Sequence, residues 1–330
     1  MTVRHPLLLP MLVALLLLGA VGSLALGVVP LSPARILAVL TGHGDETARA
    51  ILLDLRLPRM VLGIAVGGML GLAGASLQGY LRNPLAEPSV LGASNAAALG
   101  AVAALYFGLS QLHPVVLPLL AILAALVALG VLFLLAGPAE SPLTLILAGI
   151  AVATLAGAGI SLALNLSPNP FAAMEIMTWL MGSLENRSMA HVLVAMPCVA
   201  AGAALLLADG RTLDALTLGE DGAQALGIDL GGARLRLMLG VAIGVGGAVA
   251  VSGAIGFVGL IVPHLVRPLT DRSPSAILLP SLLGGAALLT FADIAVRLIP
   301  TSSELKLGVL TAILGVPVFL VHLMRERRLW

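Results

Sequence analysis

Long apolar runs without charge dominate this chain and predict its elements. Residues 88–139, 141–174 and 237–266 contain no Asp, Glu, Lys or Arg. Soluble domains are roughly a quarter charged, whereas a helix that crosses a bilayer needs about 20 apolar residues. The pattern therefore predicts an all-α, polytopic membrane protein with about ten transmembrane helices. The predicted helices are 7–29, 60–81, 92–108, 115–136, 142–166, 190–208, 235–253, 257–269, 275–296 and 307–324.

Short segments and the N-terminus complicate this count. Residues 257–269 form a short helix, and 171–183 are apolar but too few to cross, which favours a half-helix. The first apolar run, preceded by Arg4, could be a cleaved signal peptide, but it is long for one. We interpret it as the first membrane helix of a single transmembrane domain that spans residues 1–330.

Composition excludes several kinds of chemistry. The chain has 330 residues, 10% of them charged, and a net charge of +1, which argues against a nucleic-acid partner. No pair of His or Cys residues has the spacing of metal ligands, so we expect no metal and no cofactor in this chain. The single lysine, Lys306, follows Leu305, so the chain lacks the GxxxxGK loop that binds ATP. If ATP drives its activity, a partner ATPase must bind the nucleotide and Mg²⁺.

Basic residues predict the orientation in the membrane. Cytoplasmic loops carry an excess of Lys and Arg, and the best assignment places both termini in the cytoplasm. Three arginines on the predicted outer side are then anomalous: Arg56 and Arg59 flank Pro58, and Arg297 follows the helix 275–296. They either snorkel to the interface or have a function there. The cytoplasmic set is Arg4, Arg82, Arg211, Arg234, Arg236, Arg267, Arg272, Arg325, Arg327 and Arg328.

The two halves of the chain resemble each other. Residues 56–88 and 234–268 each begin with closely spaced arginines, continue through a glycine-rich helix and end at a proline-rich break. The two helices start on opposite sides of the membrane, so the second to fifth and the seventh to tenth predicted helices form an inverted repeat, which is typical of transporters.

A polar break at 209–232 interrupts the apolar pattern. Within it, Ala215, Leu218, Ala223 and Leu226 form a short apolar face between charged residues. An apolar face in a polar segment needs a hydrophobic partner, which favours short helices that bind another protein over a bare loop.

Several motifs along the chain together resemble one family. The most specific is the stretch 78–92, QGYLRNPLAEPSVLG, and others lie at 147–149, 179–183, 256–264, 304–308 and 315–319. They are similar to the FecCD family, the membrane permeases of bacterial importers for iron–siderophores, haem and vitamin B12. One departure is Lys306, where relatives often have proline.

The resemblance implies a function and partners. It implies a homodimeric permease of an ATP-binding-cassette importer in the inner membrane, with two ATPase subunits, a periplasmic substrate-binding protein and no enzymatic activity of its own. Translocation would proceed by alternating access. The expected cargo is a ferric chelate such as a siderophore, with haem or cobalamin as alternatives. A secondary transporter driven by ions is the competing class, but it would bury ionisable residues at mid-membrane for coupling. The predicted spans bury essentially none, since Glu175, Asp293 and Glu304 all lie near helix ends.

The resemblance also implies site residues. Docking of the binding protein would involve Arg56, Arg59 and Arg297, and coupling to the ATPase would involve the segment 209–232. Ser161 and Asn165 would line the pathway, unless they serve helix–helix hydrogen bonds. The cytoplasmic gate would be Asn83, Leu85, Pro142 and Leu143, and the coupling residues Leu218, Gly219, Glu220, Asp221, Ala223, Leu226 and Gly227.

Overall fold

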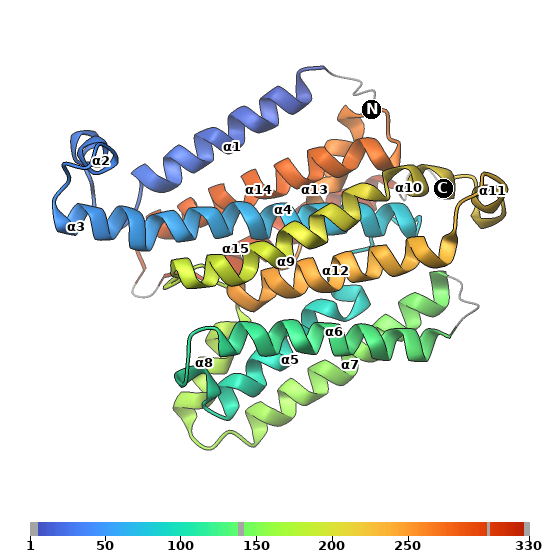
Figure 1. Ribbon diagram of the computed structural model, residues 1–330, viewed down its shortest axis with the longest axis horizontal. Helices are drawn as coiled ribbons and strands as arrows, with labels where there is room; N and C mark the ends of the chain where they lie inside the picture. Colours follow the sequence, from blue (N-terminus) through green and yellow to red (C-terminus); the bar gives the residue numbers. More distant parts are fainter. Residues whose placement is uncertain (1–5, 138–141, 302–303, 327–330) are drawn as a thin grey trace.

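The computed structural model describes residues 6–137, 142–301 and 304–326. The regular secondary structure of these residues is helical (Figure 1). Most of the long helices run along one axis of the molecule. The helices are α1 Leu8–Ala25, α2 Pro33–Leu40, α3 Glu46–Arg49, α4 Leu57–Tyr80, α5 Ala93–Tyr106, α6 Val116–Ala136, α7 Pro142–Asn165, α8 Pro170–Leu180, α9 Met189–Ala208, α10 Gly210–Leu216, α11 Glu220–Ala225, α12 Leu230–Ser252, α13 Val258–Val266, α14 Pro274–Leu298 and α15 Leu307–Glu326.

All ten segments predicted as membrane helices are helical, and the predicted half-helix is α8. Within the described residues, seven helices are long and apolar enough to cross a bilayer, and α5, α13 and α15 are shorter apolar helices. This agrees with a polytopic membrane protein. The number of crossings and the inverted repeat remain predictions.

The start of α4 differs from the prediction. The sequence pattern placed it at residue 60, but the chain is helical from Glu46, through α3 and a π-helical segment Ala50–Arg56, to Tyr80. Pro58 has no N–H, and its ring crowds the carbonyl four residues earlier, so a wider turn before it relieves the clash. Asp45 accepts a hydrogen bond from the Ala48 N–H at 2.6 Å and caps the helix, a start signal that the apolar pattern does not contain.

Small residues allow the central helices to approach closely. A Cβ atom on Gly67 would lie 2.3 Å from the Gly285 carbonyl oxygen, and one on Gly71 would lie 2.2 Å from the Ser281 carbonyl oxygen. The backbones of α4 and α14 are therefore in contact, as is common between helices in lipid. Both α4 and α12, which begin the two predicted repeats, are mostly buried in this core.

The two ends of the bundle carry different features. The short helices α10 and α11 lie at one end, and α2, α3 and α8 lie at the opposite end (Figure 1). We call these the α11 end and the α3 end. The orientation of the two termini in the membrane stays a prediction.

Candidate functional site

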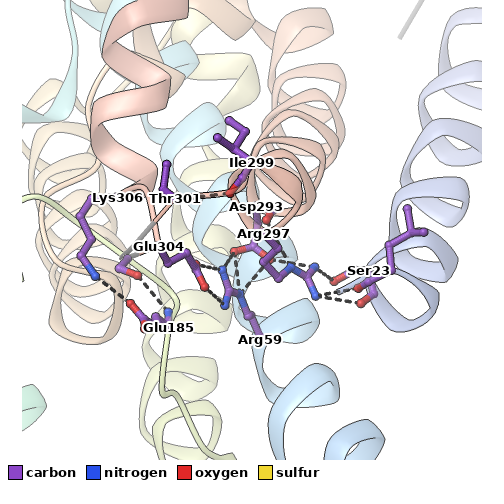
Figure 2. A network of polar contacts seen from close by, with 11 residues as sticks. Ser23, Arg59, Glu185, Asp293, Arg297, Ile299, Thr301, Glu304 and Lys306 are labelled. Carbon is purple, nitrogen blue, oxygen red and sulfur yellow. Dashed lines mark hydrogen bonds and ion pairs between the residues drawn. The ribbon is translucent and has the colours of Figure 1, made fainter. Parts of the chain in front are cut away.

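A buried ion-pair network joins α4, α14 and the segment before α15 at the α3 end (Figure 2). Asp293, which is 1% exposed, lies between two guanidinium groups. Arg59 Nε donates to its Oδ1 at 2.8 Å, and Arg297 Nη2 lies 3.0 Å from its Oδ2. Arg59 also donates to both carboxylate oxygens of Glu304, with Nη1 3.0 Å from Oε2. Arg59 thus holds two carboxylates that lie 234 and 245 positions later in the chain.

Two arginines cap the C-terminal end of α1. Arg56 Nη1 donates to the carbonyl oxygens of Leu24 at 2.6 Å and Ala25 at 2.9 Å. Arg297 donates to the Ser23 carbonyl at 3.0 Å and to the Ser23 hydroxyl at 2.7 Å. The last carbonyls of a helix have no partner within the helix and carry partial negative charge, so cations stabilise them. The two side chains thereby fix α1 against α4 and α14.

The three arginines predicted to dock a binding protein are therefore engaged inside the chain. Arg56 is 5% exposed and Arg297 is 8% exposed, and the side chain of Arg59 is 11% exposed. The snorkelling alternative is wrong, because these groups bond to carbonyls and carboxylates and do not extend into water. The docking role stays a prediction, and it requires the guanidinium groups to exchange partners.

The expectation that the spans bury essentially no ionisable group is also wrong. Asp293 lies within the predicted span 275–296, inside α14, and is buried. Arg56, Arg297 and Asp209 are also buried, but they lie outside the predicted spans. An acidic residue near the end of an apolar helix suggests an interfacial position. Here the residue is buried because Arg59 and Arg297 supply opposite charge.

A second ion pair holds the segment 184–187, which connects α8 to α9. Lys306 Nζ lies 2.7 Å from Glu185 Oε2, and the Gly308 N–H donates to the Gly182 carbonyl at 3.3 Å. Lys306, which stands where relatives often have proline, thus adds a tie between two loops. The segment borders two cavities, of about 240 Å³ and 460 Å³.

The predicted coupling segment forms two short helices at the α11 end. Gly227 follows α11 with a positive φ of 82°, and the Ile228 and Gly227 N–H groups donate to the carbonyls of Ala223 and Gln224. This is the Schellman ending, for which glycine is favoured. Glu220 and Asp221 lie in the first turn of α11, where negative charge is stabilised.

The apolar face of this segment is only partly available to a partner. Leu218 is 68% exposed and Leu226 is 63% exposed, so both remain candidates for contact with another protein. Ala223 is 0% exposed, and its assignment to the contact face is wrong. One turn of α11 must bury one side against the chain, and Ala223 is the small residue that lies there.

Side-chain bonds tie these short helices to the long ones. The Ser275 N–H at the start of α14 donates to Asp214 Oδ1 of α10 at 2.9 Å. Arg236 of α12 donates to the buried carboxylate of Asp209 at 2.9 Å and 2.8 Å. These bonds connect α10 to the first turn of α14, and the junction of α9 and α10 to α12.

The predicted gate residues lie in partly exposed positions. Asn83 Oδ1 accepts a hydrogen bond from the Leu85 N–H at 2.9 Å, which shapes the break after α4. Leu85 is 38% exposed and borders a small hollow with residues of α13 and α15. Leu143 is 63% exposed, and the side chain of Pro142 lies outside the described residues. The gate assignment stays a prediction.

The two predicted pathway residues lie on the outer surface of this single chain. Ser161 and Asn165 are both exposed near the end of α7. Exposure is compatible with either a pathway between two copies or contact with lipid. Their assignment therefore stays a prediction as well.

Fold and composition define the class as a polytopic helical membrane protein. Residues 15–325 match the FecCD transport family. The chain belongs to this family, and the resemblance found in the sequence is confirmed.

Similar proteins cover almost the whole chain. It is 41% identical to the vitamin B12 import system permease protein BtuC of Vibrio vulnificus strain CMCP6, over 97% of this chain and 94% of that protein. It is 40% identical to the Fe(3+) dicitrate transport system permease protein FecD of Escherichia coli K12, over 92% and 94%. A solved inward-facing structure described as a metal-chelate type ABC transporter superposes with a TM-score of 0.88 at 32% identity, over 97% of this chain and 100% of that one. The two sequence relatives are both named as permease proteins of import systems.

Proposed function

We propose that this chain is the transmembrane permease subunit of an ATP-binding-cassette importer that carries a ferric chelate across the bacterial inner membrane. Two copies would form the pathway, with two ATPase subunits on the cytoplasmic side and a substrate-binding protein in the periplasm. Movement of cargo would occur by alternating access. The family match over residues 15–325 is the observation that carries the proposal.

The residues of this chain support a transporter in which a separate subunit binds ATP. Its single lysine cannot belong to a GxxxxGK loop, so ATP and Mg²⁺ would bind to the partner ATPase. The α11 end offers Leu218 and Leu226 as exposed apolar anchors for that partner. This end would therefore face the cytoplasm, together with both termini.

The α3 end would face the periplasm and receive the binding protein. Docking through Arg56, Arg59 and Arg297 would require acidic side chains that compete with Asp293, Glu304 and the α1 carbonyls. Arginine suits such an exchange because its planar fork holds one carboxylate with two hydrogen bonds. Charge reversal at Arg56 and Arg59 should slow association of the binding protein and change its salt dependence. An unchanged association rate would argue against docking at these residues.

Cargo is assigned to ferric chelates because a permease for ferric dicitrate and a metal-chelate type transporter are among the similar proteins. Haem and cobalamin remain alternatives, since a vitamin B12 permease is equally similar. Within the pathway, Asn83, Leu85, Pro142 and Leu143 would form the cytoplasmic constriction, and Ser161 and Asn165 would line the cavity.

Reconstitution tests the proposal. Liposomes that contain the permease with its ATPase and binding protein should accumulate labelled ferric siderophore, haem or cobalamin only when ATP is supplied. The permease alone should accumulate nothing. Uphill uptake by the lone chain, driven by a proton or sodium gradient, would replace this proposal by the ion-driven secondary transporter.

A further inference from the structure

The cavity of about 460 Å³ beside α8 has the size of a small-molecule site, roughly 300–1,000 Å³. Its α8 wall carries Phe171, which is 86% exposed, and Met174, which is 66% exposed. Its other wall is the segment 183–187 together with Lys306. A ligand that enters would meet an apolar surface on one side and a polar loop on the other.

Two residues that line this cavity carry buried hydrogen-bond donors without acceptors. Trp179 Nε1 and Arg187 Nε are both buried, and neither has a hydrogen-bond partner among the described residues. Both atoms can only donate. Buried donors are nearly always paired, and each exception calls for an explanation. A turn of these side chains toward the cavity would bring both donors to the oxygen acceptors of a ligand bound there.

The charges around the cavity single out Arg187. Lys306 and Glu185 neutralise each other through their 2.7 Å contact. Glu175 lies exposed on α8, where water solvates it. Burial lowers the pKa of Arg187, and the nearby Glu185 carboxylate opposes that shift only in part. Since burial disfavours the charged guanidinium, an anion beside it would be stabilising.

We propose that Arg187 and Trp179 form an oxyanion-binding subsite that holds a carboxylate or phosphate group of the chelate cargo. The apolar body of the chelate would rest on Phe171 and Met174. The planar guanidinium suits both oxyanions, and the indole N–H adds a second donor. The Glu185–Lys306 pair positions the loop that carries Arg187. This proposal rests on the proposed import function and adds that the cargo carries an oxyanion.

Uptake by the reconstituted complex tests the subsite. Three cargoes are compared. Ferric citrate carries carboxylates, cobalamin carries a phosphate, and a ferric trihydroxamate is uncharged. Arg187→Gln should raise the KM for the oxyanion cargo about tenfold and leave kcat nearly unchanged, because one charge-assisted bond is lost. Arg187→Lys should retain part of the affinity, and Trp179→Phe should show a smaller rise. The control is Arg35→Gln, since Arg35 is an exposed arginine that pairs with Asp45.

The outcomes separate this inference from the function on which it rests. If the wild-type complex takes up none of the three cargoes with ATP, the proposed function fails and the subsite fails with it. If it takes up only the uncharged chelate, or if Arg187→Gln leaves the KM for every cargo unchanged, the subsite is wrong while import stands. If Arg187→Gln instead weakens association of the binding protein equally for all cargoes, Arg187 pairs with an acidic side chain of that protein. That result would overturn the small-molecule subsite. Sensitivity to citrate alone or to cobalamin alone identifies the oxyanion as carboxylate or phosphate.

Discussion

Replacement of Asp293 by Asn removes the charge at the centre of the ion-pair network and should destabilise the chain strongly. Removal of one partner from a buried pair costs about 3–5 kcal/mol, because the remaining charge loses its compensation. Here Arg297 would keep the Ser23 hydroxyl at 2.7 Å, and Arg59 would keep Glu304 at 3.0 Å. The lower end, about 3 kcal/mol, is therefore expected.

A graded series makes this expectation sharper. Glu304→Gln should cost less, about 1–2 kcal/mol, because Arg59 would retain Asp293 and the Glu304 side chain is 15% exposed. Asp45→Asn breaks an ion pair of the same type, with Arg35, at an exposed position. It should cause no resolvable change, since exposed pairs contribute little.

Unfolding in mixed micelles measures the series. The purified variants would be titrated with sodium dodecyl sulfate and followed by circular dichroism. The expected order of midpoints, from lowest to highest, is Asp293→Asn, Glu304→Gln, then Asp45→Asn together with wild type. Equal midpoints for Asp293→Asn and Asp45→Asn would refute the argument that the buried network stabilises the α3 end.

Three further predictions concern other parts of the chain. Leu218→Asp and Leu226→Asp should each abolish co-purification with the ATPase while the permease stays folded, and intact co-purification would refute the coupling proposal. Lys306→Pro should retain expression, because the Lys306 N–H donates no hydrogen bond within the described residues; loss of expression would mean that its ion pair is essential. Gly71→Ala should lower stability by about 1–3 kcal/mol through its clash with the Ser281 carbonyl, measured by the same micelle titration, and an unchanged midpoint would contradict the close contact of α4 and α14.

The local pattern of apolar residues predicted the helices correctly. Each predicted apolar segment is helical, because in lipid every backbone polar group must be satisfied within its own segment, and an uncharged run of that length has few alternatives. The exceptions also have local causes. The early start of α4 depends on the Asp45 cap and on the π-helical turn before Pro58, which apolar periodicity does not detect.

In the candidate site, too, features that depend on local sequence were predictable and features that depend on packing were not. Exposed Leu218 and Leu226 were predictable, since an apolar residue in a short polar segment has few places to be buried. The burial of Ala223 between them was not, because it depends on which side of one helical turn faces the chain. The sequence pattern did not single out Arg187. Its significance comes from the cavity and from the donor without an acceptor.

By itself, the sequence determined that this is a polytopic helical membrane protein without an ATP-binding loop, and its motifs identified the family. Only the tertiary structure decided what the outer arginines contact. Arg59 and Asp293 are separated by 234 positions, and Arg56 reaches carbonyls that lie 27 to 32 positions earlier. The physical reason is that hydropathy and helix propensity act over a few turns, whereas the pairing of buried charges depends on which helices pack together and in which rotation.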